Sequence, residues 1–83
     1  MDENKQENHQ PLRQLVETAL ETYFSNLEGQ SVCNIHKMVI REVEIGLFNV
    51  ILKLTRGNQS RAAVYLGLAR GTLRKRLEEY GLN

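Results

Sequence analysis

Five polar or basic side chains lie close together near the carboxyl end of the chain and could bind an anionic polymer. They are Arg70, Thr72, Arg74, Lys75 and Arg76. Guanidinium and ammonium groups bind phosphate oxygens, and an arginine can also donate paired hydrogen bonds to the edge of a guanine. Arg70 would lie at the leading end of a helix, with Arg74 one turn behind it on the same face. The cluster therefore predicts contact with nucleic acid.

A helix from about Arg70 to Tyr80 would position this cluster. Its apolar residues Leu73, Leu77 and Tyr80 recur at i, i+4 and i+7, which is one face of a helix. The basic side chains then lie on the remaining faces.

A shorter helix is expected before it, starting near Gln59 and ending at Gly67. Glycine enters a positive-φ turn without the penalty of a Cβ atom. Ala62 and Ala63 are small enough for two helices to approach closely, and Leu68 would follow the turn as an apolar plug. This is the pattern of a DNA-binding helix-turn-helix, whose second helix enters the major groove. The alternative is a helical hairpin with an ordinary solvated basic face.

The distribution of charge favours the first interpretation. Residues 1–52 contain 4 Lys and Arg against 8 Asp and Glu, a balance of −4, and residues 53–83 contain 7 against 2, a balance of +5. The net charge of +1 thus conceals a basic segment that coincides with the helix-turn-helix, as a phosphate-binding patch would.

Two longer helices are expected in the first part of the chain. Residues 1–10 are polar and predict a disordered tail, after which Pro11 fits the first turn of an amphipathic helix. Ser31 or Asn34 can cap a second helix that runs to about Thr55 and ends before Gly57.

The later half of this second helix is apolar in nearly all directions and must be covered on every side. One chain of this size provides too little cover, so we expect a two-fold dimer built on a helical bundle. The predicted dimer core consists of Leu47, Val50, Ile51 and Leu54. The fold class is therefore all-α, with two dimerisation helices in residues 11–56 and a helix-turn-helix region in residues 57–83 (motif about 59–78).

Several kinds of function are not supported by the sequence. It contains no glycine-rich phosphate loop, no nucleophile with a plausible base and no Cys/His cluster for zinc, so we expect neither an enzyme nor a cofactor or metal. Glu42 and Glu44 are expected to face solvent, and Glu78 and Glu79 to pair with the basic residues before them. No apolar run approaches 18 residues, so no membrane segment is expected and the chain should be cytoplasmic.

Three segments resemble the Fis family of bacterial nucleoid-associated proteins. They are Thr55 to Ala63, Arg70 to Lys75 and the ending Tyr80 to Asn83, with a looser similarity that covers about 70 residues in all. The resemblance implies a homodimer that binds degenerate, A·T-rich sites in double-stranded DNA, bends them, and acts in chromosome organisation and transcription.

The resemblance also implies roles for individual residues. Arg70 would contact a guanine edge and Lys75 would reach into the groove, whereas Thr72 and Arg74 would contact the DNA backbone. Asn58 and Ser60 would bind phosphate. Arg56 and Gly57 resemble a surface that this family presents to RNA polymerase.

Three departures from the family pattern limit what carries over. Ala69 stands where relatives can have an asparagine, which weakens a helix cap, and Glu78 and Glu79 replace a pair of lysines. Only about ten polar residues precede Pro11, so we do not expect the long N-terminal arm with which Fis-family proteins contact recombinases. The resemblance therefore implies DNA binding and bending, but not stimulation of site-specific inversion. Two alternatives stay open: an effector domain of an enhancer-binding activator, and a helical module that binds protein or RNA.

Overall fold

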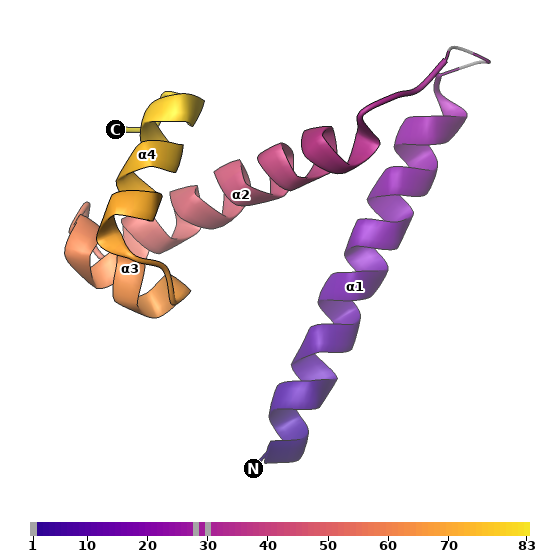
Figure 1. Cartoon of the computed structure of the whole chain (residues 1–83). Helices are drawn as coiled ribbons and strands as arrows, with labels where there is room; N and C mark the ends of the chain where they lie inside the picture. Colours follow the sequence, from indigo (N-terminus) through magenta and orange to yellow (C-terminus); the bar gives the residue numbers. More distant parts are fainter. Residues whose placement is uncertain (1, 28, 30) are drawn as a thin grey trace. The chain divides into compact units, whose positions relative to one another are not determined.

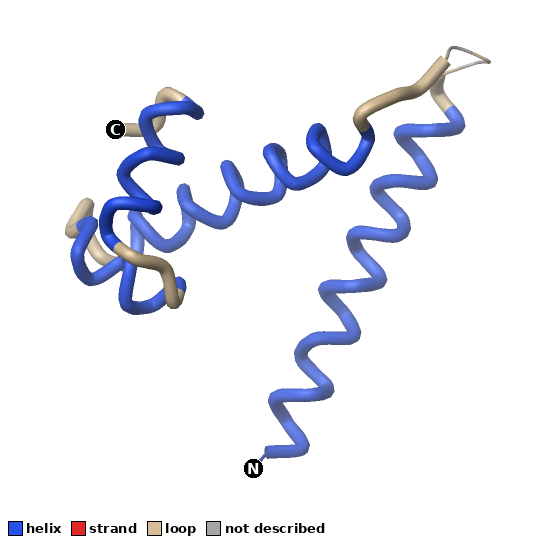
Figure 2. The backbone as a smooth tube through the Cα atoms, viewed as in Figure 1, coloured by secondary structure: helices blue, strands red, loops and turns tan. Residues whose placement is uncertain are grey.

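The computed structural model describes the backbone of residues 2–27, 29 and 31–83, and the side chains of residues 11–27, 29 and 31–83. Within these residues the chain forms four α-helices and no β-strand (Figure 1, Figure 2): α1 (Asp2–Ser25), α2 (Ile35–Leu54), α3 (Gln59–Leu66) and α4 (Arg70–Tyr80). The all-α class and the four helices are confirmed. The chain divides into two compact units, residues 1–32 and residues 33–83.

Helix α1 begins at Asp2, nine residues earlier than the sequence predicts. The expected disordered tail is therefore helical from Asp2 onward, and Met1 lies outside the described residues. The glutamate, glutamine and lysine residues of this stretch are good helix formers. Pro11 consequently lies inside the helix, where its missing N–H removes one backbone hydrogen bond.

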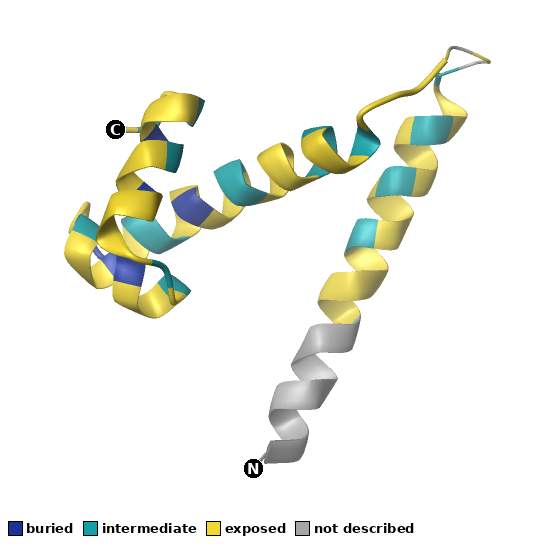
Figure 3. Cartoon of the chain, in the orientation of Figure 1, coloured by how far each residue is buried: buried dark blue, intermediate teal, exposed yellow. Residues whose placement is uncertain are grey.

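The apolar stripe of α1 is only partly buried (Figure 3). Leu12 and Leu15 are exposed, whereas Val16 and Phe24 are half-buried. The rings of Tyr23 and Phe24 pack edge to face, with their centroids 5.4 Å apart. None of the described side chains of α1 is fully buried.

Helix α2 ends where the sequence predicts, but it begins without the expected cap. Asn34 precedes its first residue in the left-handed conformation, with φ of 54°, and its side chain makes no capping hydrogen bond. A capping side chain needs an extended backbone to reach the first turn, whereas asparagine also tolerates the left-handed region. At the other end, the Thr55 hydroxyl donates to the Ile51 carbonyl at 3.0 Å and closes the last turn.

The turn between α3 and α4 has the predicted geometry. Gly67 adopts a φ of 73°, and its N–H donates to the Val64 carbonyl at 3.1 Å. The N–H of Leu68 donates to the Ala63 carbonyl at 3.0 Å, which completes the hydrogen bonding of a left-handed helix end. The chain therefore reverses sharply at a residue whose backbone conformation a Cβ atom would strain.

The core of the second unit lies where α2, α3 and α4 meet (Figure 3). Its fully buried apolar residues are Phe48, Ala62, Ala63, Leu73 and Leu77. Truncation of a leucine at such a site costs about 2–5 kcal/mol, so burial of two leucines fixes α4 firmly against α2 and α3.

Candidate DNA interface

The exposed side of α4 carries most of the predicted binding residues. Arg70, Thr72, Arg74 and Lys75 are all exposed. Leu73 and Leu77, on the other side of the helix, are 1% and 0% exposed. Because these leucines hold the helix by one side, the basic side chains face outward on a rigid element.

The N-terminus of α3 places Asn58 and Ser60 beside one another on the surface. Both residues are exposed. The Oδ1 atom of Asn58 accepts a hydrogen bond from the N–H of Arg61 at 3.0 Å, so Asn58 caps the helix. Its amide NH₂ group stays available as a donor, and the positive end of the helix dipole lies next to it.

A shallow depression of about 220 Å³ joins the first turn of α3 to the first turn of α4. Gln59, Arg70, Gly71 and Arg74 line it. Two guanidinium groups and the positive ends of two helix dipoles therefore meet at one place, which suits an anion such as a phosphate. Sequence reasoning missed Gln59, although its position between Asn58 and Ser60 could have indicated it.

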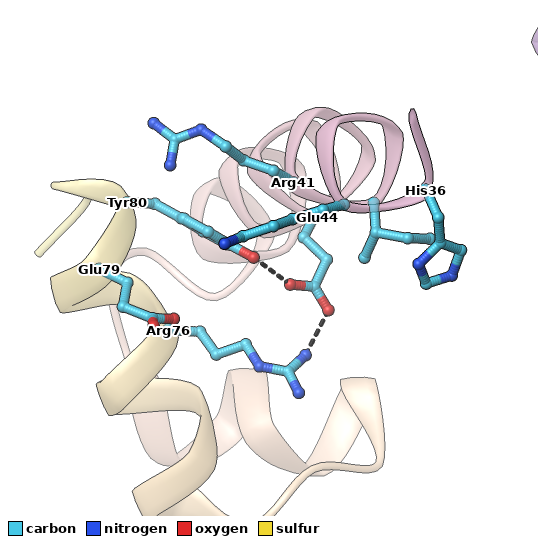
Figure 4. A pocket seen from close by; sticks show the side chains of 8 residues that line it. His36, Arg41, Glu44, Arg76, Glu79 and Tyr80 are labelled. Carbon is cyan, nitrogen blue, oxygen red and sulfur yellow. Dashed lines mark hydrogen bonds and ion pairs between the residues drawn. The ribbon is translucent and has the colours of Figure 1, made fainter. Parts of the chain in front are cut away.

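Arg76 differs from the other basic residues of α4. It extends toward α2 and forms an ion pair with Glu44, and the hydroxyl of Tyr80 donates to the other oxygen of the same carboxylate at 2.6 Å (Figure 4). The Glu44 side chain is only 18% exposed. The prediction that Glu44 faces solvent is therefore wrong, because two donors on α4 draw its carboxylate against that helix.

A stripe of exposed apolar side chains runs along α2. It consists of Ile40, Val43, Leu47, Val50 and Leu54, which are spaced alternately three and four residues apart. Val50 is 57% exposed and Leu54 is 67% exposed. Ile51 was predicted to belong to the dimer core together with Leu47, Val50 and Leu54. In the structure it lies outside this stripe and packs against the buried core of α2, α3 and α4. We call these five residues the α2 stripe.

Comparison with known proteins relates both units to one family. The profile of the DNA-binding protein Fis N-terminal domain matches residues 1–32, and that of the bacterial regulatory proteins of the Fis family matches residues 39–80. The proteins named DNA-binding protein Fis from Aeromonas hydrophila and Aeromonas salmonicida are 52% identical over 73 residues. The protein of that name from Yersinia enterocolitica is 49% identical over 73 residues. Each alignment covers 88% of this chain and 74% of the relative.

The chain belongs to the Fis family. The resemblance inferred from the sequence is confirmed, and the Fis-family match over residues 39–80 includes all of α3 and α4 together with most of α2. Both the exposed face of α4 and the α2 stripe fall within it.

Two of the departures from the Fis-family pattern, at Ala69 and at Glu78 and Glu79, affect the capping and the ion pairs of α4. Ala69 occupies the N-cap position with an extended backbone and offers no side-chain hydrogen bond, as its residue type predicts. Glu78 and Glu79 are exposed, and within the described residues neither forms the predicted ion pair with Arg74, Lys75 or Arg76. Such exposed pairs contribute little free energy, so the side chains stay solvated.

The turn between α2 and α3 exposes Arg56 and Gly57, the two residues predicted from the sequence resemblance as candidates for contact with RNA polymerase. Both have positive φ values, 55° for Arg56 and 82° for Gly57. The N–H of Gly57 donates to the Leu52 carbonyl at 2.8 Å, so the turn is fixed to the end of α2. A non-glycine residue in the left-handed region is uncommon and places the Arg56 side chain at a defined point of the surface.

The pKa of Tyr80 is raised above its ordinary value by its hydrogen bond to the Glu44 carboxylate and, second, by burial. The folded state therefore favours the neutral phenol, and this stabilisation is present below about pH 10 and lost as the pH rises through the raised pKa. We expect the free energy of unfolding to fall above about pH 10, and to fall less in a Tyr80→Phe variant. Unfolding by urea at a series of pH values would measure this. If the free energy of unfolding fell equally above about pH 10 in the unsubstituted protein and in Tyr80→Phe, the prediction would be wrong.

Other kinds of site find no support in the part of the chain that the structure describes. There, no helix has both the length and the hydropathy needed to span a membrane. Over the same residues, no group of three or more His, Cys, Asp or Glu side chains is placed to hold a metal ion.

Proposed function

We propose that this Fis-family protein is a dimeric regulator that binds and bends double-stranded DNA in the bacterial nucleoid. The observation that carries the proposal is the convergence of the N-termini of α3 and α4 with the side chains of Arg70 and Arg74 at one depression. A helix that is anchored by buried leucines and leads with an arginine suits insertion into a major groove.

The residues divide into those that read bases and those that fix position. Arg70 contacts a guanine edge, and Lys75 reaches into the groove. Thr72 and Arg74 contact the DNA backbone. Asn58 and Ser60 bind phosphate at the start of α3, where the helix dipole favours an anion.

The dimer is proposed to form through the α2 stripe. Its spacing of three and four residues is that of a helix that packs along another helix. Leu47, Val50 and Leu54 leave a continuous apolar surface that a second copy would cover, whereas Ile51 supports the fold of each chain. The exposed apolar residues of α1 would enlarge this interface.

Bending follows from the proposed spacing of the two recognition helices. The Fis-family resemblance implies that a dimer holds them closer together than one turn of B-DNA, about 34 Å. Both helices then reach adjacent major grooves only if the duplex curves and the intervening minor groove narrows. Narrowing is easiest in A·T-rich sequence, so the uncontacted centre of the site should prefer A·T pairs.

Regulation is proposed to involve a second partner. Arg56 and Gly57 lie on the turn before α3 and directly precede Asn58 in the sequence. We assign this turn to contact with RNA polymerase, in line with the Fis-family resemblance.

A gel-shift assay on a duplex with an A·T-rich centre, combined with the mass from light scattering, tests binding and assembly. We expect a dimer that binds the duplex, and mobility that depends on where the site lies within fragments of constant length. A bend of about 40–90° costs on the order of 1–6 kcal/mol. Glu78 and Glu79 reduce the positive charge that offsets this cost, so the bend should be small or sensitive to salt.

Several outcomes would contradict the proposal. Mobility that is independent of site position, with no loss of affinity when the central pairs are changed to G·C, would exclude bending. Tight binding to one sequence with very weak non-specific binding would favour an activator-type effector domain. Stronger binding to duplex RNA would exclude the major-groove mode, because the narrow A-form groove does not admit a helix.

A further inference from the structure

Glu44 and Arg76 join two helices that lie far apart in the sequence. Glu44 is on α2 and Arg76 is on α4, 32 residues later. The carboxylate receives a guanidinium N–H on one oxygen and the Tyr80 hydroxyl on the other (Figure 4). These residues form part of the wall of a groove of about 430 Å³ between α2 and α4.

This pairing changes the charge that α4 presents to solvent. The Arg76 side chain remains 39% exposed, so it borders the surface that carries Thr72, one turn earlier on the same side of the helix. Its positive charge is nevertheless neutralised by a carboxylate that is itself mostly buried. Phosphate and carboxylate oxygens both accept charge-assisted hydrogen bonds from guanidinium N–H groups, so a DNA phosphate would compete with Glu44 for Arg76.

The packing of α4 does not depend on the charge of Glu44. Leu73 and Leu77 are fully buried against α2 and α3, and the Tyr80 ring stacks on Phe48 with centroids 6.2 Å apart. A glutamine in place of Glu44 could still accept the hydrogen bond of Tyr80, and would remove only the charge that holds Arg76.

We propose that Glu44 is an internal counterion that withholds Arg76 from DNA phosphate and so limits the sequence-independent affinity of the protein for DNA. This inference rests on the proposed DNA binding. Arg76 is then a positive charge next to the DNA interface that stays paired with Glu44. The contacts of Arg70, Thr72, Arg74 and Lys75 suffice for site selection. Glu44 acts through Arg76 and does not itself contact DNA.

The first test compares Glu44→Gln with Glu42→Gln in the full chain. Both substitutions remove one negative charge from α2, but Glu42 is exposed and outside the Arg76 pair. We expect Glu44→Gln to bind duplex DNA about fivefold more tightly per chain than Glu42→Gln near 0.1 M salt, and to steepen the dependence of log K on log salt by about 0.9 per chain. The gain should be equal on A·T-rich and G·C-rich duplexes.

The second test is independent of whether Glu44→Gln folds. It compares Arg76→Gln with Lys75→Gln, which removes a cation proposed to reach DNA. We expect Lys75→Gln to make the salt dependence shallower by about one unit, and Arg76→Gln to change it by less than half as much. A third comparison applies where Glu44→Gln folds: adding Arg76→Gln to that variant should cancel its gain in affinity.

Two results would overturn the inference. One is a salt dependence of Glu44→Gln equal to that of Glu42→Gln, with equal or weaker affinity. The other is an equal loss in Arg76→Gln and Lys75→Gln, which would mean that Arg76 already binds phosphate. If none of the proteins binds duplex DNA, the proposed function itself is wrong. If they bind DNA but show either of the two results above, only the counterion role of Glu44 is wrong.

Discussion

Replacing Val50 with aspartate should prevent the proposed dimer from forming and abolish tight binding to DNA. Val50 is 57% exposed in a single chain, so the substitution has little effect on the core formed by α2, α3 and α4. In a dimer formed through the α2 stripe, the new carboxylate would be buried without a partner, at a cost on the order of 3–5 kcal/mol. Because both chains carry the substitution, this cost arises twice and lowers the association constant of the dimer by more than about a thousandfold. Sedimentation and a gel-shift assay at micromolar protein would measure both effects.

A matched control separates this effect from that of added charge. Asn49 is also exposed on α2, but it lies outside the stripe, so Asn49→Asp should leave the protein dimeric. Ile51→Asp should unfold the chain whether or not a dimer forms, because Ile51 packs against the core within each chain. A Val50→Asp protein with the mass of a dimer would mean that the α2 stripe is not the interface. A wild-type protein that is a compact monomer would exclude the dimer altogether.

The helix-turn-helix could be predicted from the sequence because short-range chemistry determines it. Gly67 permits the left-handed turn, as predicted. The cap that Asn58 forms with the N–H of Arg61, only three positions away, was not predicted but depends on equally local chemistry. Leu73 and Leu77 form one face of α4 by simple periodicity, and they are buried as expected. Each of these signals lies within a few residues of the structure that it specifies.

Other features depend on competition between local preferences, or on contacts between residues that are far apart in the sequence. They could not be predicted from local patterns. The polar composition of residues 1–10 suggested disorder, whereas good local helix propensity is enough to extend α1 to Asp2. Asn34 has the right residue type for a cap but the wrong backbone conformation. The bond from Tyr80 to Glu44 spans 36 residues, and no periodic pattern reveals such a pair. The division of the chain at residues 11 and 57 stays a prediction, as do the roles of individual residues in DNA binding.

The second large effect, a loss of DNA affinity and of base discrimination, is expected when Arg70 is replaced. This residue is exposed at the first position of α4 and lines the depression at the start of α3, so it would be the first side chain to reach the floor of a major groove. A bidentate arginine–guanine pair contributes about 1–3 kcal/mol of discrimination. Arg70→Ala should therefore lose about ten- to hundredfold in affinity for a preferred site, and should no longer distinguish guanine from other bases at one position. Titration of duplexes that differ only at that position would measure it.

Arg74→Ala provides the matched comparison, because it removes the same side chain one turn further along α4. As a backbone contact, Arg74 should weaken binding evenly across sequences and make the salt dependence shallower by about one unit. Loss of base discrimination should occur in Arg70→Ala alone. If both substitutions reduced affinity equally on every duplex, Arg70 would be a phosphate contact, and site selection would depend entirely on the shape and deformability of the DNA.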